Sequence, residues 1–133
     1  MLGRLTYEGL SAAYSSMPRN EFVDRMNSIP KYVASTTLTE PTWNATVIEG
    51  DVAAFVADLK SRAGGDILKY GNGSLDVTLM NHRLIDEFHL LLTPVALGRG
   101  QHLFEHLDGA PQLRLLDVSP FTNGVVVLKY APN

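Results

Sequence analysis

The glycine turn at Gly71, Asn72 and Gly73 is the part of this sequence whose residue types are best suited to hold an anion. It follows an apolar run at 67–70 and leads into an amphipathic segment that opens at Ser74, which predicts a strand, a tight turn and a helix. Because glycine has no Cβ, backbone N–H groups in such a turn can approach a phosphate closely. The following helix would add unpaired N–H groups and the positive end of its dipole. The same turn also occurs as a plain connection, so its neighbours must decide between the two interpretations.

Two more segments carry groups that bind phosphate. Gly3, Arg4 and Thr6 combine a backbone open to approach, a guanidinium and a hydroxyl, with Thr6 expected as the N-cap of the first helix. Ser35 and Thr36 place two hydroxyls at the end of an expected strand. Ligands of open α/β sheets bind beyond the carboxyl ends of the strands. We therefore expect these segments to share one sheet edge with the glycine turn, although each alone could be a routine turn.

The segment 102–106 reads H-x-x-E-H, a pattern found in zinc peptidases. His102 and His106 could share one helix face and bind zinc, with Glu105 as the base. Glycines close to both ends leave room for only a short helix, whereas such sites need a long helix and a distant third ligand. We therefore expect no metal site, and we interpret these side chains as solvated polar groups beside two core residues.

His89 and the acidic pair at 86–87 are the remaining candidates for acid–base chemistry. His89 lies in an apolar run, where we expect it on one face of a sheet with a hydrogen-bond partner. An acidic pair at the start of a strand more often solvates a turn. The sequence therefore assigns no catalytic residue.

The elements that must position these groups alternate between helix and strand. Apolar spacing and capping residues predict helices over 6–17, 20–29, 51–63 and 74–82. Apolar runs between turn residues predict strands over 31–36, 45–48, 66–70, 87–94, 113–118 and 125–130. We expect the strand at 87–94 to be central and the last two strands to form an antiparallel pair. The pattern is typical of an α/β protein with a mixed sheet.

The composition excludes several classes of function. Lys and Arg together number 11 against 14 Asp and Glu, so no basic surface is available for a nucleic-acid partner. The chain has no cysteine, which excludes disulfides, cysteine-bound metal and thiol catalysis. No run approaches the ~18 apolar residues of a membrane span, and the 133 residues suit one domain. We expect no membrane association and a cytoplasmic location.

Several motifs together resemble a known family. They include L-G-R-x-T-Y-E at 2–8, M-N-x-x-P-K-Y-V-A-S-T-T-L at 26–38, G-G-D-I-L-x-x-G-x-G-x-L at 64–75, L-I-D-E-F at 84–88 and P-V-x-L-G-x-G at 94–100. In this order they resemble the dihydrofolate-reductase-like proteins grouped with the C-terminal reductase domain of the bifunctional riboflavin-biosynthesis deaminase-reductase. The resemblance implies a mixed, mostly parallel sheet flanked by helices, with a C-terminal antiparallel strand pair, in one reductase-like domain over 1–133.

The same resemblance implies NADPH as cofactor, hydride transfer to a small-molecule substrate, and a homodimer. Gly3, Arg4 and Thr6 resemble the turn that holds the cofactor's phosphates, and Ser35 and Thr36 resemble the strand end beside its 2′-phosphate. The glycine turn that lies under the cofactor's pyrophosphate in the family is resembled by Gly71, Asn72, Gly73, Ser74 and Leu75.

The chain departs from the family pattern in two ways. Family members carry a further N-terminal segment that supplies the first, central strand and another strand. We expect this chain to lack the family's usual N-terminal strands. The riboflavin-pathway reductases also have an acidic residue before the glycine turn, where this chain has Tyr70, and a phenol cannot replace a carboxylate as a charged acceptor. The first departure favours an alternative function, a catalytically inactive, truncated nucleotide-binding or assembly module. A zinc hydrolase using His102 and His106 is a third hypothesis.

Overall fold

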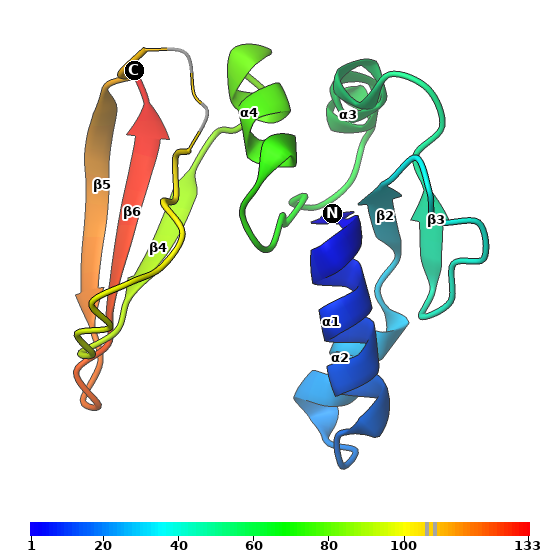
Figure 1. The fold of residues 1–133 in the computed structure, drawn as a ribbon, viewed down its shortest axis with the longest axis horizontal. Helices are drawn as coiled ribbons and strands as arrows, with labels where there is room; N and C mark the ends of the chain where they lie inside the picture. Colours follow the sequence, from blue (N-terminus) through cyan, green and yellow to red (C-terminus); the bar gives the residue numbers. More distant parts are fainter. Residues whose placement is uncertain (106, 108) are drawn as a thin grey trace. The chain divides into compact units, whose positions relative to one another are not determined.

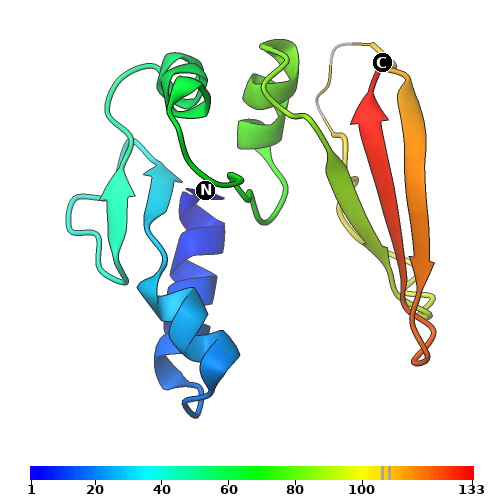
Figure 2. The same ribbon diagram turned by 180° about the vertical axis from the view of Figure 1, so that it is seen from behind.

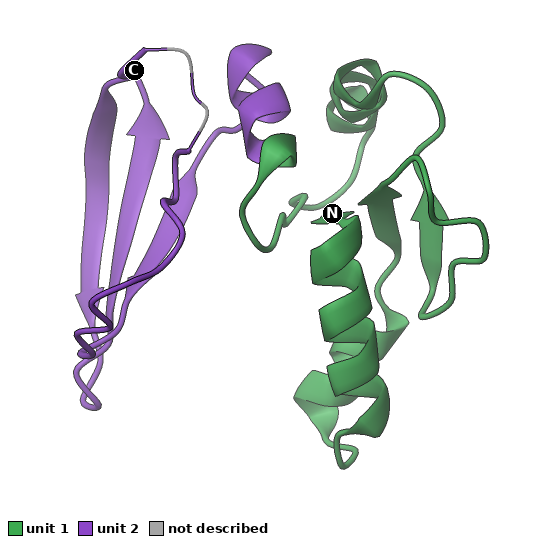
Figure 3. Ribbon diagram, viewed as in Figure 1, with its two compact units in different colours: residues 1–75 green, residues 76–133 purple. Residues whose placement is uncertain are grey.

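The structure is a computed structural model that describes residues 1–105, 107 and 109–133. The chain divides into two compact units, unit 1 at Met1–Leu75 and unit 2 at Asp76–Asn133, shown in different colours in Figure 3. Whether residues 1–133 act as one domain stays a prediction.

Unit 1 consists of a small parallel sheet and three helices (Figure 1). In chain order its elements are β1 Leu2–Gly3, α1 Arg4–Ser16, α2 Glu21–Ser28, β2 Lys31–Ala34, β3 Ala45–Val47 and α3 Val52–Ser61. Two of the helices begin at the capping residues that the sequence predicts. The Asn20 side chain accepts a hydrogen bond from the N–H of Val23 at 2.9 Å, and the Asp51 side chain accepts one from the N–H of Ala54 at 2.7 Å.

The first helix starts earlier than expected. Helix α1 begins at Arg4, its N-cap is Gly3, and no side chain caps it, so the prediction that Thr6 is the N-cap is wrong. The physical reason is that the extended backbone of Gly3 already ends the strand, which leaves Thr6 inside the first turn.

The parallel sheet has the strand order β1-β2-β3. Leu2 pairs with Val33, and Lys31, Tyr32 and Val33 pair with 45–47 of β3. The strand expected at 66–70 does not form, because its pairing with β1 is limited to one parallel bridge between Leu2 and Tyr70. The N–H of Tyr70 donates to the carbonyl of Met1, and the Met1 amino group donates to the carbonyl of Leu68. Residues 66–70 therefore run beside β1 as an edge segment.

Helices cover both faces of this sheet. On one face Leu2, Tyr7 of α1 and Val33 form a buried cluster, in which Val33 has no exposed surface. On the other face Tyr32 packs edge to face against Phe55 of α3, with ring centres 5.2 Å apart. Unit 1 therefore has its own core.

Helix α4 (Ser74–Asn81) begins at Ser74, as the sequence predicts. Its first two residues belong to unit 1 and the rest to unit 2. The strands of unit 2 are β4 Phe88–Leu92, β5 Leu113–Pro120 and β6 Val126–Pro132. They form an antiparallel sheet in the order β4-β6-β5, with a bulge between Leu115 and Asp117 (Figure 2). The expected pairing of the last two strands is thus confirmed. The prediction that 87–94 is the central strand is wrong, because β6 pairs on both sides and leaves β4 at an edge.

The α/β class is therefore confirmed, with parallel pairing in unit 1 and antiparallel pairing in unit 2. None of the helices formed by the described residues is both long and apolar enough to cross a bilayer.

Candidate functional site

The carboxyl ends of neighbouring strands lie side by side in unit 1. Gly3 pairs with Ala34 across the parallel ladder, and Leu2 forms its bridge with Tyr70, so Gly3, Ala34 and Gly71 stand at the same level of the sheet. Figure 1 shows the first turn of α1 at the end of the sheet to which the β2 arrow points. Because adjacent strands are about 4.8 Å apart, the three segments that follow these positions start within roughly 10 Å of one another. The structure thus brings together the candidate segments at 3–6, 35–36 and 71–75.

The backbone at this edge is open to approach from outside. A Cβ added at Gly3 or at Gly73 would meet no atom within 4 Å. The first N–H groups of α1 have no side-chain cap, and its first turn holds no acidic residue. The unpaired N–H groups and the helix dipole make this end of α1 favourable for an anion.

Thr6 and Gly71 link two of the candidate segments. Gly71 has a φ of +80°, and a Cβ added there would lie 2.3 Å from Oγ1 of Thr6. The glycine is therefore required by packing against α1 as well as by its backbone conformation. Beyond it, Asn72 is exposed, whereas Leu75 is buried and anchors the start of α4.

Ser35 shapes the loop that follows β2. Its Oγ accepts hydrogen bonds from the N–H groups of Thr37 at 3.1 Å and Leu38 at 3.0 Å. Strand β2 therefore ends at Ala34, two residues before the expected end, and Thr36 is exposed in the turn. A hydroxyl that accepts these bonds still has its own proton to donate to a ligand.

Two cationic side chains lie close to this edge. Arg4 pairs with Glu8 one turn along α1, at 2.7 Å from Nη1 to Oε1. Lys69 donates from Nζ to the carbonyl of Gly71 at 2.6 Å. Burial, and to a smaller extent the charge of Lys69, lower the pKa of the Met1 amino group to about 6. Sequence reasoning did not single out Lys69, although its position two residues before the glycine turn was a usable signal.

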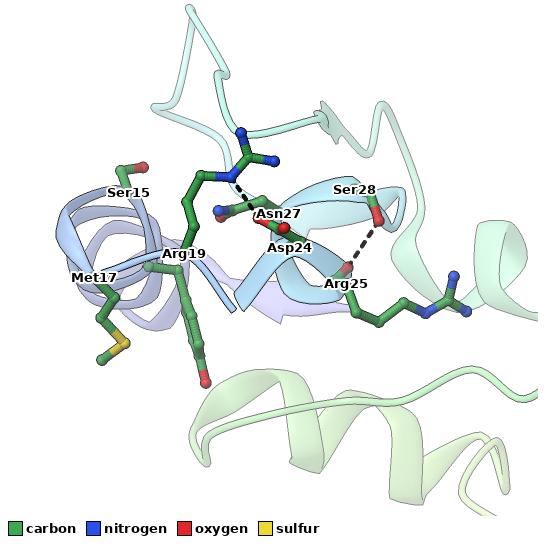
Figure 4. A pocket seen from close by; sticks show the side chains of 8 residues that line it. Ser15, Met17, Arg19, Asp24, Arg25, Asn27 and Ser28 are labelled. Carbon is green, nitrogen blue, oxygen red and sulfur yellow. Dashed lines mark hydrogen bonds and ion pairs between the residues drawn. The ribbon is translucent and has the colours of Figure 1, made fainter. Parts of the chain in front are cut away.

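A shallow concavity of about 800 Å³ lies elsewhere in unit 1, beside the end of α1 and along α2. Figure 4 shows that Arg19 reaches across it to Asp24, with 2.9 Å between Nε and Oδ1. The residues around it are Tyr14, Ser15, Met17, Arg19, Asp24, Arg25, Asn27 and Ser28. None of these residues belongs to the predicted site. We therefore place the candidate site at the strand ends, where the predicted segments lie at one level of the sheet.

The other candidates from the sequence gain little support. His106 lies outside the described residues, so the H-x-x-E-H pattern is not seen as a unit, and His102 is exposed. Within the described part of the chain, no three or more His, Cys, Asp or Glu residues gather as metal ligands would. His89 of β4 pairs with Glu87 at 2.9 Å, which matches the expected histidine on a sheet face with a hydrogen-bond partner.

Known proteins of similar sequence include two from Bacillus subtilis (strain 168). The chain is 36% identical to the uncharacterized protein YyaP over 121 residues, which cover 86% of this chain and 64% of YyaP. It is 35% identical to the uncharacterized protein YwjB over 82 residues, which cover 62% of this chain and 47% of YwjB. The chain therefore spans less than two thirds of the length of either relative.

A similar fold is found in a crystal structure from Shewanella sp. PV-4, of a protein provisionally named for riboflavin biosynthesis. The two structures superpose with a TM-score of 0.76 at 22% identity, over 99% of this chain and 72% of the other. The family model of the RibD C-terminal domain matches residues 1–127, which confirms the resemblance drawn from the motifs. The chain therefore belongs to the RibD C-terminal domain family.

Proposed function

We propose that this chain binds NADPH at the carboxyl edge of its parallel sheet and serves as a reductase for a small-molecule substrate. The observation that carries the proposal is the register of unit 1, which aligns Gly3, Ala34 and Gly71 at one level. Membership of the RibD C-terminal domain family supports the identity of the ligand. In such proteins the cofactor supplies the hydride, and the protein binds and orients it.

The groups at this edge fit a dinucleotide with several phosphates. The open space beside Gly3 and Gly73 lets a pyrophosphate approach, and the start of α1, which no side chain caps, offers N–H donors to it. The guanidinium of Arg4 and the ammonium of Lys69 supply positive charge beside them. We assign the hydroxyls of Ser35 and Thr36 to the 2′-phosphate, as the family resemblance implies.

The proposal predicts a preference for NADPH over NADH, because NADH lacks the 2′-phosphate that the Ser35 segment would bind. Isothermal titration calorimetry with both nucleotides measures this preference directly. Equal affinities, or binding of neither nucleotide, would contradict the proposal.

An arginine pair provides a matched control for the same titration. Arg4 and Arg19 each form one exposed ion pair in unit 1, with Glu8 and Asp24 respectively. Only Arg4 lies at the strand ends, so Arg4→Ala should lose a charged phosphate contact worth about 1.5–3 kcal/mol, or roughly 10- to 100-fold in affinity. Arg19→Ala should bind NADPH as the unaltered protein does.

Hydride transfer is tested separately from binding, by following NADPH oxidation with a panel of small carbonyl and heterocyclic substrates. Oxidation that depends on a substrate supports the reductase. Tight NADPH binding without oxidation of any kind would instead favour the alternative, an inactive nucleotide-binding module.

A further inference from the structure

The hydroxyl of Ser35 is oriented by the turn that follows β2. A serine hydroxyl has two acceptor lone pairs and one proton. The Ser35 Oγ already accepts from two N–H groups, that of Thr37 at 3.1 Å and that of Leu38 at 3.0 Å. The turn therefore uses the acceptor capacity of this hydroxyl and leaves its proton for a ligand. A ligand atom at Ser35 must then be an acceptor, as a phosphate oxygen is.

Leu38 anchors this turn to the rest of unit 1. Its N–H donates to Ser35, and its half-buried side chain packs against the buried cluster of Leu2, Tyr7 and Val33. These three residues belong to β1, α1 and β2, the elements whose ends form the candidate site. The packing of Leu38 thus ties the orientation of the Ser35 hydroxyl to the elements that surround the site.

We propose that Leu38 is a positioning residue for the 2′-phosphate of NADPH and acts by holding Ser35 as a donor, an assignment that rests on the proposed function. Leu38 does not contact the cofactor in this account. A hydrogen bond to an ionised oxygen is about twice as strong as one to a neutral oxygen. NADH has a neutral hydroxyl in place of this phosphate, so loss of the Leu38 anchor should weaken binding of NADPH more than binding of NADH.

The far end of the same loop provides a matched control. The Tyr7 hydroxyl accepts a hydrogen bond from the N–H of Thr42 at 2.8 Å, close to the start of β3. Tyr7→Phe removes this bond but keeps the ring of the cluster on which Leu38 packs. It should therefore lower the stability of unit 1 without changing the turn at Ser35.

Isothermal titration calorimetry with NADPH and NADH tests the assignment. We expect Ser35→Ala to lower the ratio of NADPH affinity to NADH affinity roughly 10-fold, the loss of one hydrogen bond to a charged group. Leu38→Ala should lower the ratio by a similar factor, and Tyr7→Phe should leave it unchanged. In the Ser35→Ala background Leu38→Ala should lower the ratio no further, because Leu38 acts through Ser35.

Amide hydrogen exchange without nucleotide tests the anchor separately. The amide at position 38 should exchange faster in Leu38→Ala than in the unaltered chain, and at the unaltered rate in Tyr7→Phe. Leu38→Met, which nearly conserves the side-chain volume, should retain both this protection and the nucleotide preference. If Leu38→Ala fails to fold, Leu38→Val should change both measurements in the same direction.

The possible failures are distinguishable. An unchanged affinity ratio in Leu38→Ala, an equal loss in Tyr7→Phe, or unchanged exchange at position 38 would overturn the role of Leu38 and leave NADPH binding intact. Binding of neither nucleotide by the unaltered chain would instead overturn the proposed function, and the role of Leu38 with it, even if the exchange rates change as expected.

Discussion

Replacement of Gly71 by alanine tests how the glycine turn is held against α1. Alanine at this position must adopt a φ of +80° and place its Cβ 2.3 Å from Oγ1 of Thr6. The left-handed backbone costs about 1–2 kcal/mol, and forcing a methyl group into an occupied position costs about 1–3 kcal/mol. We therefore expect Gly71→Ala to destabilise unit 1 by roughly 2–5 kcal/mol, the sum of these two costs.

Gly50 is the matched control for the backbone part of this cost. It lies in the same unit with a φ of +74°, and a Cβ added there would meet no atom within 4 Å. Gly50→Ala should therefore cost only the backbone contribution of about 1–2 kcal/mol.

The remaining difference is assigned to Thr6 by a double-mutant cycle. Thr6→Ala removes the Oγ1 and Cγ2 atoms nearest to the added methyl group and leaves the Thr6 Cβ at 3.2 Å. In the Thr6→Ala background, Gly71→Ala should thus cost only slightly more than Gly50→Ala, because the Thr6 Cβ remains close, and we expect a coupling of about 1–3 kcal/mol.

Urea unfolding followed by tryptophan fluorescence measures these values. Trp43 is the only tryptophan of the chain and lies in unit 1, so its signal reports on the unit that carries the changes. The slope of the unfolding free energy against urea concentration should be the same in all variants, whereas the urea concentration at the midpoint should fall as stability is lost. Equal destabilisation by Gly71→Ala and Gly50→Ala would contradict the close approach of Thr6 to Gly71. The same holds if Thr6→Ala does not reduce the destabilisation that Gly71→Ala causes.

Two further predictions concern unit 1. Asn20→Ala and Asp51→Ala each remove the cap of one helix and should lower stability by about 1 kcal/mol in urea unfolding; no change would argue against these caps. Lys31 is buried, with its Nζ 4.1 Å from the centre of the Trp43 ring, and burial lowers the pKa of its ammonium below 10.5. Because the unfolded chain then binds the proton more tightly, unit 1 should become more stable as the pH rises toward 10.5. Lys31→Met should lose this rise, and urea midpoints measured across that range would show whether it does.

Local interactions explain what the sequence could predict. The caps at Asn20 and Asp51 involve residues three positions apart, so they are readable from the sequence and are present in the structure. Likewise the last two strands are close along the chain and form the predicted antiparallel pair. The family resemblance also came from local motifs and is confirmed over residues 1–127.

Long-range pairing explains what the sequence could not predict. The edge position of β4 depends on β6, which follows it by more than thirty residues. The contact between Thr6 and Gly71 and the hydrogen bond from Lys69 to the Gly71 carbonyl likewise exist only in the folded chain. Thr6 could be mistaken for an N-cap because a backbone cap at Gly3 leaves no sequence signal. The shared edge of the candidate segments was an expectation from topology, and the register of β1 and β2 provides its geometry.

Binding of NADPH at the strand ends is the central claim, and amide chemical shifts of the ¹⁵N-labelled chain test it most directly. On titration with NADPH we predict the largest shifts at Arg4, Thr36 and Gly73, and smaller shifts at Thr36 when NADH replaces NADPH. The amides of Arg25 and Ser28, beside the concavity on α2, should remain unchanged. Shifts centred on Arg25 and Ser28, with none at Arg4 and Gly73, would contradict the claim.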